Sequence, residues 1–443
     1  MKRNTGNLLP FLTRKAGTSA VFGVVCLLGL TRPSDPAFAL EYDGGIAVIS
    51  LHGFIEGRAL SGSRALSWEN GGFGKTPFGG RQSGENRAIG HVQTGAALQI
   101  RYGWDWSANV IVTASGRQYH TVDLQEVFLR YKPAPTGDIA IDARIGIMFP
   151  PVSLENDGIA WTSPFTLSPS AINAWIGDEV RGLGGELAAS WRFNIANENL
   201  RLRADAGLFG YDDPAGALLA WRGWAVHDQT AGVFERHQLP PIRTLRPGGN
   251  IAQQAPWVEP FHELDGRPGY YAGLSLESDA RDQLRLLFYD NRADSQVFDG
   301  RQYAWHTRFG NLGISTSLPG DIDFISQAMF GRTTMALRPP PLGGVVDMDF
   351  SSAFVLVSRA WDKHRISARL EYFDTRDHDF TPDDNNAERG NASTLAYIFR
   401  PADIHRLTFE VARVYSDRAE RVYAGFVRSQ IETIAQASWR IIY

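Results

Sequence analysis

Arginine and carboxylate residues recur at every second position along several segments of this 443-residue chain. Arg201 and Arg203 flank one leucine, and Asp142 and Arg144 flank one alanine. Side chains two residues apart lie on the same face of a β-strand, so these charges share a face. A row of guanidinium groups along a low-dielectric wall concentrates counter-ions. The chemistry that this pattern predicts is electrostatic selection of solutes.

The arginines on these charged faces form one set, which we expect to line a channel. Its members are Arg101, Arg130, Arg144, Arg192, Arg201, Arg203, Arg285, Arg308, Arg369, Arg400 and Arg440. We place Arg144, Arg308 and Arg369 near the middle of their strands. The others lie near one shared end of the strands, which would be the periplasmic end if the strands cross an outer membrane. The functional interpretation is a modest anion preference. Two alternatives stay open: the arginines pair with carboxylates on the same faces, or they oppose acidic residues across a constriction and orient dipolar solutes.

Motifs for catalysis are absent from the sequence. There is no Gly-x-Ser-x-Gly, no complete phosphate-binding Gly-x-x-x-x-Gly-Lys-Ser/Thr loop and no His-Glu-x-x-His. His227, His237 and His262 share one segment without ligand spacing, and residues 383–388 lack the alternating ligand order of a calcium loop. We therefore predict no enzymatic activity, no metal site and no cofactor.

The elements that position the charged faces are short alternating segments. The last one places Thr433, Ala435, Ala437, Trp439, Ile441 and Tyr443 on one face. Sixteen such segments are joined alternately by short turns and longer loops. Residues 303–318 could form two strands with a turn at 310–313, so counts from 14 to 18 stay open.

A closed barrel follows from this pattern if the strands lie in a membrane, because an open sheet edge in lipid leaves unpaired N–H and C=O groups. The fold class that we predict is all-β, a transmembrane antiparallel β-barrel of about 16 strands around an aqueous lumen. Both chain ends then lie on the periplasmic side. A large soluble β-sandwich or solenoid is the alternative with the same period.

The N-terminus predicts export. Basic residues precede an apolar run at 16–30, and Ala37-Phe38-Ala39 fits a signal-peptidase site. We expect cleavage after Ala39, so that residues 1–39 are a signal peptide and residues 40–443 form one barrel domain. The run is too short for a membrane anchor. The location that follows is the outer membrane of a Gram-negative cell.

Composition narrows the class further. The only cysteine, Cys26, lies in the leader, so the mature chain holds no disulfide and no thiolate metal site. The leader carries five basic residues and one acid, so the net charge of −4 becomes −8 after cleavage. That balance argues against nucleic-acid binding. Trp104, Trp106, Trp191, Tyr270, Trp361, Tyr397, Trp439 and Tyr443 lie near strand ends, as aromatic girdles require.

The insertion at residues 149–179 is the third outer loop. Ser168 before Pro169 predicts a helix N-cap, Gly177 predicts its end, and Ile172, Trp175 and Ile176 form an apolar stripe. The stripe needs a dry surface, so we expect the loop to fold inward and narrow the channel; a lid over the mouth is the alternative. The expected constriction residues are Glu155, Asp157, Trp161, Trp175, Asp178 and Glu179.

This stretch carries a family resemblance. Its motifs are Phe149-Pro150-Pro151, Glu155-Asn156, Trp161, Ser170-Ala171-Ile172-Asn173, Trp175-Ile176-Gly177 and Glu179-Val180-Arg181. The region resembles the phosphate-selective porin O/P-like family of outer-membrane porins. The resemblance implies a sixteen-stranded trimeric barrel with an inward third loop and passive diffusion of small solutes. That family's phosphate channels use lysine-rich interiors, whereas residues 40–443 contain only Lys75, Lys132 and Lys363, so phosphate preference does not carry over.

The expected function is an outer-membrane porin for small hydrophilic solutes. The rivals are an adhesion or binding barrel acting through the fourth loop, residues 211–268, and a barrel enzyme of lipase or protease type. If the protein is a binding barrel, aromatic residues in or beside that loop would stack on a sugar or an aromatic solute. These residues are Trp221, Trp224, Trp257, Tyr270 and Tyr271. The expected partners are outer-membrane lipid and lipopolysaccharide, the barrel-insertion machinery through the strand that ends at Tyr443, and two further copies in a homotrimer.

Overall fold

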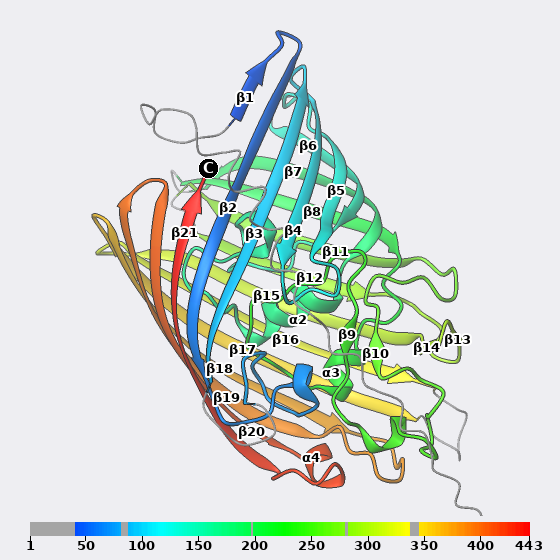
Figure 1. Cartoon of the computed structure of the whole chain (residues 1–443). Coiled ribbons are helices and arrows are strands. Elements are labelled where there is room, and N and C mark those ends of the chain that lie inside the picture. The colour runs from blue at the N-terminus through cyan, green and yellow to red at the C-terminus, as the bar shows by residue number, and fades with distance from the viewer. Residues whose placement is uncertain (1–39, 81–86, 196–197, 280–281, 337–344) are drawn as a thin grey trace, which may run out of the picture. The chain divides into compact units, whose positions relative to one another are not determined.

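A computed structural model describes residues 40–80, 87–195, 198–279, 282–336 and 345–443. The expected leader, residues 1–39, lies outside the described residues. Sixteen antiparallel strands form one closed barrel (Figure 1). They are β2 (Ala47–Gly62), β3 (Arg87–Tyr102), β4 (Trp106–Ser115), β5 (Val122–Tyr131), β6 (Ile139–Met148), β7 (Gly182–Ile195), β8 (Glu198–Gly210), β11 (Gly269–Ser278), β12 (Gln283–Asp290), β15 (Trp305–Leu318), β16 (Ile322–Met335), β17 (Val346–Trp361), β18 (His364–Asp377), β19 (Glu388–Ala402), β20 (His405–Arg418) and β21 (Ser429–Ile442).

Smaller elements accompany the barrel. Strand β1 (Leu40–Asp43) pairs with β2, β9 (His237–Gln238) pairs with β10 (Trp257–Val258), and β13 (Phe298–Asp299) pairs with β14 (Gln302–Tyr303). The helices are α2 (Ala171–Glu179), α3 (Ala217–Trp221) and α4 (Glu420–Tyr423), with single turns η1 (Trp68–Asn70), η2 (Ile159–Trp161) and η3 (Arg243–Leu245). None of the helices in the described ranges is long and apolar enough to cross a membrane.

The first and last barrel strands close the ring. Phe54 to Ser61 of β2 pair with Ile442 to Ala435 of β21. Beyond β21, the Gly53 N–H donates to the Tyr443 carbonyl at 2.8 Å, and the Tyr443 N–H donates to the Gly53 carbonyl at 3.0 Å. The C-terminal aromatic residue therefore belongs to the seam of the barrel.

Alternation assigns the two faces of each strand. On β6 and β7, Ile145 and Leu187 are exposed on the outside, whereas Asp142 and Glu186 are buried on the inside. The stretch that could have been two strands is one, because β15 pairs with β16 without interruption from Trp305 to Leu318. This settles the barrel at sixteen strands.

Connections are short at one end of the barrel and long at the other. The β3–β4 turn and the β5–β6 turn each contain a glycine with positive φ, Gly103 (59°) and Gly137 (65°), which a tight reversal favours. At the other end, residues 63–80 belong to the first loop, residues 149–181 form the third loop and residues 211–268 form the fourth loop. The alternation of short and long connections agrees with the sequence.

Candidate channel interior

The third loop lies inside the barrel, where α2 packs against the wall (Figure 1). Ile172 and Ile176 are fully buried. The Trp175 ring meets the Phe309 and Phe350 rings of the wall edge-on, with centroids 5.5 and 5.3 Å apart. The apolar stripe predicted from the sequence thus rests on β15 and β17, and the loop is no lid over the mouth.

Helix α2 begins and ends two residues later than the sequence predicted. Ser170 caps it, because its hydroxyl accepts the Asn173 N–H at 3.3 Å. The Ser168 N–H instead donates to Glu410 on β20 at 3.1 Å. Gly177 does not end the helix; a Cβ there would lie 2.9 Å from the Trp161 ring, so the glycine admits that indole.

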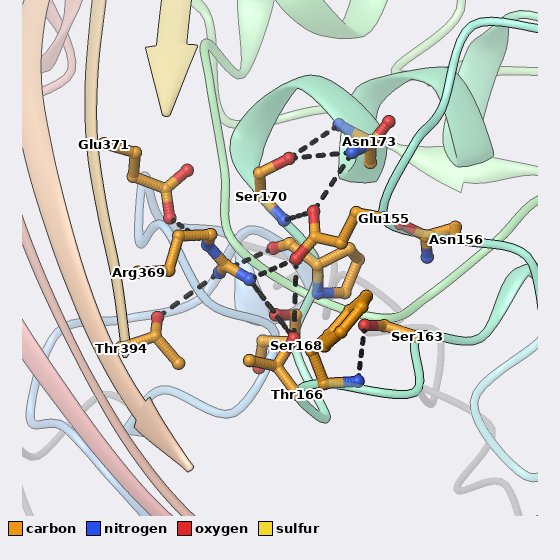
Figure 2. Close-up of polar contacts among 12 residues, drawn as sticks. Glu155, Asn156, Ser163, Thr166, Ser168, Ser170, Asn173, Arg369, Glu371 and Thr394 are labelled. Atoms are coloured by element: carbon orange, nitrogen blue, oxygen red, sulfur yellow. Dashed lines mark hydrogen bonds and ion pairs between the residues drawn. The ribbon is translucent and has the colours of Figure 1, made fainter. Parts of the chain in front are cut away.

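Arg369 of β18 ties the third loop to the wall (Figure 2). The side chain is fully buried, with its Nη1 at 2.6 Å from Glu155 Oε1 and its Nε at 3.1 Å from Glu371 Oε1. It also donates to the Ser168 carbonyl at 2.7 Å. Wall arginine and loop acid are therefore in direct contact, so the expected field across an open gap does not arise at this point.

The two acids beside Arg369 also satisfy the start of α2. Glu155 accepts from the Ser170 N–H at 2.9 Å and from the Asn173 amide at 3.0 Å, and Glu371 accepts from the Ala171 N–H at 2.7 Å. The first N–H groups of a helix have no partner within it and attract negative charge. The cluster therefore positions both the loop and its helix.

The fourth loop also enters the barrel. Leu218, Trp221 and Trp224 are fully buried and pack in the interior core, so these tryptophans do not offer the solute-stacking surface of the binding alternative. Glu179 at the end of α2 accepts the Leu218 N–H at 2.7 Å and joins the two loops. Burial raises the pKa of Glu179 to about 7.

The other three aromatic residues that the binding alternative required, Tyr271, Tyr270 and Trp257, lie apart from one another. Tyr271 lies on the inner face of β11, where its hydroxyl donates to Glu186 at 2.8 Å. Tyr270 is on the opposite, outer face of the same strand. Trp257 is half-buried beneath the Arg236 guanidinium, 4.0 Å from its ring centroid. No common stacking surface forms from these three residues.

Asp178 lies close to an arginine and a histidine between the third and fourth loops. Arg222 Nη2 lies 2.7 Å from Asp178 Oδ2, and His227 Nε2 lies 3.1 Å from the same oxygen. Burial alone would raise the pKa of Asp178, but His227 and Arg222 hold it well below its usual range. The expected constriction acids Glu155, Asp178 and Glu179 are thus all buried in loop packing.

The two other expected constriction residues differ. Trp161 has a positive φ of 60°, and its ring packs on Phe149 with centroids 4.3 Å apart. Its indole N–H donates to the Asn173 carbonyl at 2.8 Å. Asp157 is exposed. Of the six constriction residues expected from the sequence, only Asp157 presents an exposed charge.

The first loop also occupies part of the barrel interior. Phe73 and Lys75 are fully buried. Lys75 Nζ lies 2.5 Å from Glu388 Oε1 on β19, and the Lys75 N–H donates to Glu432 on β21 at 2.6 Å. Burial lowers the pKa of Lys75 to about 7. A buried ion pair therefore fixes this loop as well.

One apolar core joins the loops to the inner wall. Its wall members include Tyr289, Phe309, Met329, Met348, Phe350 and Phe373, and its loop members include Phe73, Ile172, Trp175, Leu218, Trp221 and Trp224. The expectation of an open aqueous lumen is wrong for this part of the interior. The inward positions near the outer ends of β12 and β15–β18 are apolar, and helices cover them.

A polar gap persists beside β2–β4. A cavity of about 40 Å³ separates the wall from the third and fourth loops. The wall supplies Gln93, Thr113 and Ser115, the β4–β5 connection supplies Arg117, and the third and fourth loops supply Ala160, Thr162, Asp228 and Thr230. Arg117 and Asp228 bring one charge of each sign to this gap.

Most of the expected channel arginines face inward and are paired. The ion pairs are Arg101–Glu41 (3.4 Å), Arg130–Asp142 (2.5 Å), Arg144–Glu186 (2.7 Å), Arg203–Asp142 (3.5 Å), Arg440–Glu56 (2.8 Å) and Arg201–Glu277. Arg285 donates to the Pro151 carbonyl at 3.1 Å. Arg192 and Arg400 are exposed on inner faces and have no ion pair within the described residues. This geometry favours the alternative in which pairing makes the wall rigid.

Arg308 departs from the expectation. Arg308 pairs in register with Asp290 of β12 and Arg332 of β16. Phe288 and Phe330, two residues away on those strands, lie on the same face and are exposed, so this is the outer face of the sheet. The buried Phe309 beside it takes the inward position. Arg308 therefore faces outward near the outer rim, and its placement in the lumen was wrong by one residue of register.

The described residues contain one group of carboxylates close enough to hold a metal ion. Ligand atoms of Asp213, Glu263 and Asp265 lie within 4.8 Å of one another. Asp213 accepts the N–H groups of Leu264 (2.5 Å) and Asp265 (3.1 Å). These bonds give the cluster a structural role in folding the fourth loop.

No protein-family model and no curated protein matches the sequence. Among solved structures, the chain is similar to the outer membrane channel DcaP of Acinetobacter baumannii, with 9% identity and a TM-score of 0.51 over 90% of this chain and 98% of that one. OmpT of Vibrio cholerae has 10% identity and a TM-score of 0.48 (92% and 100% covered), and an anion-selective porin from Comamonas acidovorans has 11% and 0.47 (90% and 100%). The likeness to DcaP shows the fold of an outer-membrane channel.

Proposed function

We propose that this protein is an outer-membrane porin that lets small hydrophilic solutes diffuse passively along β2–β4. The observation that carries the proposal is the polar gap between Thr113 and Ser115 on the wall and Thr162 and Thr230 on the loops. Hydroxyl, amide and paired charged groups there replace hydration without fixing one ligand. The remaining cross-section is occupied by the apolar core, so the path is narrow and conductance is low.

Planar-bilayer recording tests this path. Thr113→Trp places a large side chain in the gap and should lower single-channel conductance several-fold. Val112→Trp is the matched control, because Val112 is the next residue on β4 and faces outward. Equal conductance in both variants would move the solute path elsewhere in the barrel.

Selectivity is a second part of the proposal. Arg192 and Arg400, exposed and without ion pairs among the described residues, supply a modest anion preference at the periplasmic entrance. The many paired arginines contribute little to it. The resemblance to phosphate-selective porins supports the porin class; with Lys75 buried against Glu388, phosphate preference gains no support.

We also propose where the protein resides in the cell and how it assembles. The leader would be cleaved after Ala39, and the barrel would sit in the outer membrane in contact with lipid and lipopolysaccharide. Its C-terminal strand, ending at Tyr443, would be read by the insertion machinery, and the chain would assemble as a homotrimer. Mass spectrometry of the mature N-terminus and membrane fractionation test these points.

A further inference from the structure

Two outer loops meet at the end of the barrel that carries the long connections (Figure 1). The seventh loop, residues 378–387, joins β18 to β19, and the eighth loop, residues 419–428, joins β20 to β21 and contains α4. The Ala419 N–H donates to the Ala387 carbonyl at 3.0 Å. This backbone bond holds the two loops side by side.

Three side chains with oxygen acceptors come together at this junction. The amide of Asn386 contacts the carboxylate of Asp384, with Nδ2 at 3.4 Å from Oδ1. Glu420, the first residue of α4, reaches the seventh loop, where its Oε2 accepts the Asn385 N–H at 3.0 Å. The carboxyl groups of Asp384 and Glu420 lie within hydrogen-bonding range of each other. We call Asp384, Asn386 and Glu420 the loop-junction group.

The loop-junction group is buried but lacks hydrogen-bond donors. Asn386 and Glu420 are fully buried, and only 6% of Asp384 is exposed. Asp384 Oδ2, Asn386 Oδ1 and Glu420 Oε1 find no N–H or O–H donor among the described residues. Two carboxylates side by side cannot donate to each other while both are ionised. Burying acceptors in this way is unfavourable unless a cation or a proton satisfies them.

The two acids of the group have no cation of their own. Burial raises the pKa of Asp384 well above its usual range, and the Glu420 carboxylate beside it raises this pKa further. Burial also raises the pKa of Glu420. The Arg418 guanidinium opposes that second shift, but Arg418 is paired with Glu388 at 3.4 Å. Within the described residues, no basic side chain forms an ion pair with either acid of the group.

The group differs in this respect from the carboxylates of Asp213, Glu263 and Asp265 in the fourth loop. Glu263 accepts the Tyr211 N–H through Oε2 and the Gly266 N–H through Oε1, both at 2.7 Å. Asp213 likewise accepts two backbone N–H groups. Those acids have donors from their own loop and need no ligand. The loop-junction group has unsatisfied oxygens instead, from two carboxylates and one amide.

Calcium has the coordination chemistry that fits these atoms. Ca²⁺ takes roughly six to eight oxygen ligands from carboxylates, amide carbonyls and water in a flexible geometry, whereas Mg²⁺ requires octahedral geometry and gives up its water reluctantly. We propose that the loop-junction group binds a Ca²⁺ ion through oxygens of Asp384, Asn386 and Glu420, with water in the remaining positions. The ligands come from two loops, which is why the order of residues 383–388 alone suggested no metal site.

A bound ion would join three outer loops. Asn386 Nδ2 also donates to the Ala220 carbonyl of α3 at 3.2 Å, so one ligand of the ion contacts the fourth loop directly. The seventh and eighth loops supply the ligands themselves. Calcium would therefore stabilise the loop arrangement at the outer end of the filled interior, whatever solute passes through the barrel.

Hydrogen–deuterium exchange of the full mature chain in detergent, after a chelator has removed bound metal, tests the site. Exchange of residues 378–387 and 419–428 should slow as Ca²⁺ is added. The effect should saturate with a dissociation constant of about 0.1–1 mM, as in extracellular calcium modules. The same concentrations of Mg²⁺ should have a smaller effect.

Isosteric variants locate the ion. Asp384→Asn combined with Glu420→Gln keeps the shape of both side chains but removes both charges, and should weaken the Ca²⁺ response by about tenfold or more. Asp383→Asn is the matched control and should keep the native response, because this neighbouring acid is half-exposed and its Oδ2 lies 3.2 Å from Arg243 Nε. If circular dichroism shows that the double variant forms no barrel, Glu420→Gln alone carries the test.

Three outcomes would overturn the proposal. Exchange that Ca²⁺ does not change in the native chain would mean that Asp384 and Glu420 share a proton instead of a metal ion. A Ca²⁺ response that survives the double substitution would place the ion elsewhere. A response lost in Asp213→Asn but kept in the double variant would assign the ion to the fourth loop.

Discussion

The two ends of the barrel interior are built from opposite kinds of side chain. Toward the outer ends of β12 and β15–β18, inward positions carry Tyr289, Phe309 and Phe350, which pack against loop helices. Toward the strand ends that are joined by short turns, inward positions carry arginines such as Arg192 and Arg400 that remain exposed. The same alternation along each strand therefore produces a sealed core at one end and a hydrated, charged vestibule at the other.

This difference shows that the width of a barrel does not decide how open it is. Sixteen strands leave room for water, but three inward loops take that room because the wall offers them apolar surface and buried carboxylates. The proposed conducting path is then set by what the loops leave uncovered beside β2–β4. Substitutions at one end of the interior can therefore be compared with substitutions at the other.

The largest effect is expected at Arg369. Arg369→Met keeps much of the volume and leaves Glu155 and Glu371 buried without their cation, which costs about 3–5 kcal/mol. We expect α2 to lose protection in hydrogen–deuterium exchange and single-channel conductance to rise. Arg101→Met, whose partner Glu41 is half-exposed, should change neither by a comparable amount. Unchanged protection of residues 171–179 would contradict the anchoring role.

Trp175→Ala should have the next largest effect. The substitution removes a fully packed indole from between Phe309 and Phe350 and leaves a cavity, at a cost of about 3–5 kcal/mol if the site does not collapse. Collapse of the loop onto the space lowers that cost below that of Arg369→Met. Exchange protection of the third loop measures it, with the fully exposed Trp104→Ala as the control. Equal protection in both variants would mean that the helix is not held by its apolar stripe.

A pH dependence should follow from Glu179. Burial raises its pKa from 4.5 to about 7, so the folded interior keeps a proton that the unfolded chain releases. This contribution is fully present below about pH 4.5 and is lost as the pH rises through about 7. In the native chain, the hydrogen-exchange protection of α3 should fall as the pH rises from about 4.5 to about 7, and in Glu179→Gln this fall should be smaller. Glu235 and Asp213, whose pKa values burial also raises to about 7, should retain the remainder. A slope unchanged by the substitution would exclude Glu179 as a source.

The smallest effect is expected in the vestibule. Arg192→Glu reverses one exposed charge, and screening over about 8–10 Å limits its reach. The anion-to-cation permeability ratio, from reversal potentials in a salt gradient, should fall by about twofold or less. Arg308→Glu reverses an outward charge near the rim and should leave the ratio unchanged. A larger shift from Arg308→Glu than from Arg192→Glu would contradict the assignment of the two faces.

Much of the fold could be predicted from the sequence because lipid imposes a strict rule on one face of each strand. The period of two in segments such as Ile139–Met148 gave the strand positions, and the alternation of short and long connections gave their number. The inward third loop followed from the stripe of Ile172, Trp175 and Ile176. Closure followed from the requirement that backbone groups in hydrocarbon be paired.

The filled interior was missed because the inner face obeys no such rule. On β17, Phe350, Phe354 and Leu356 face inward while Val355 and Val357 face outward. A strand that is apolar on both faces signals a dry partner inside as well as lipid outside. The register error at Arg308 has a different cause: a single arginine beside Phe309 fits either face, and only the pairing with Asp290 decides it.

The two hydrogen bonds between Gly53 and Tyr443 join residues that lie 390 positions apart in the chain. Synthesis delivers these partners at very different times, so the ring cannot be sealed until β21 has been made. Closure of the barrel therefore depends on its last strand, and removal of β21 would leave β2 and β20 each with an unpaired edge.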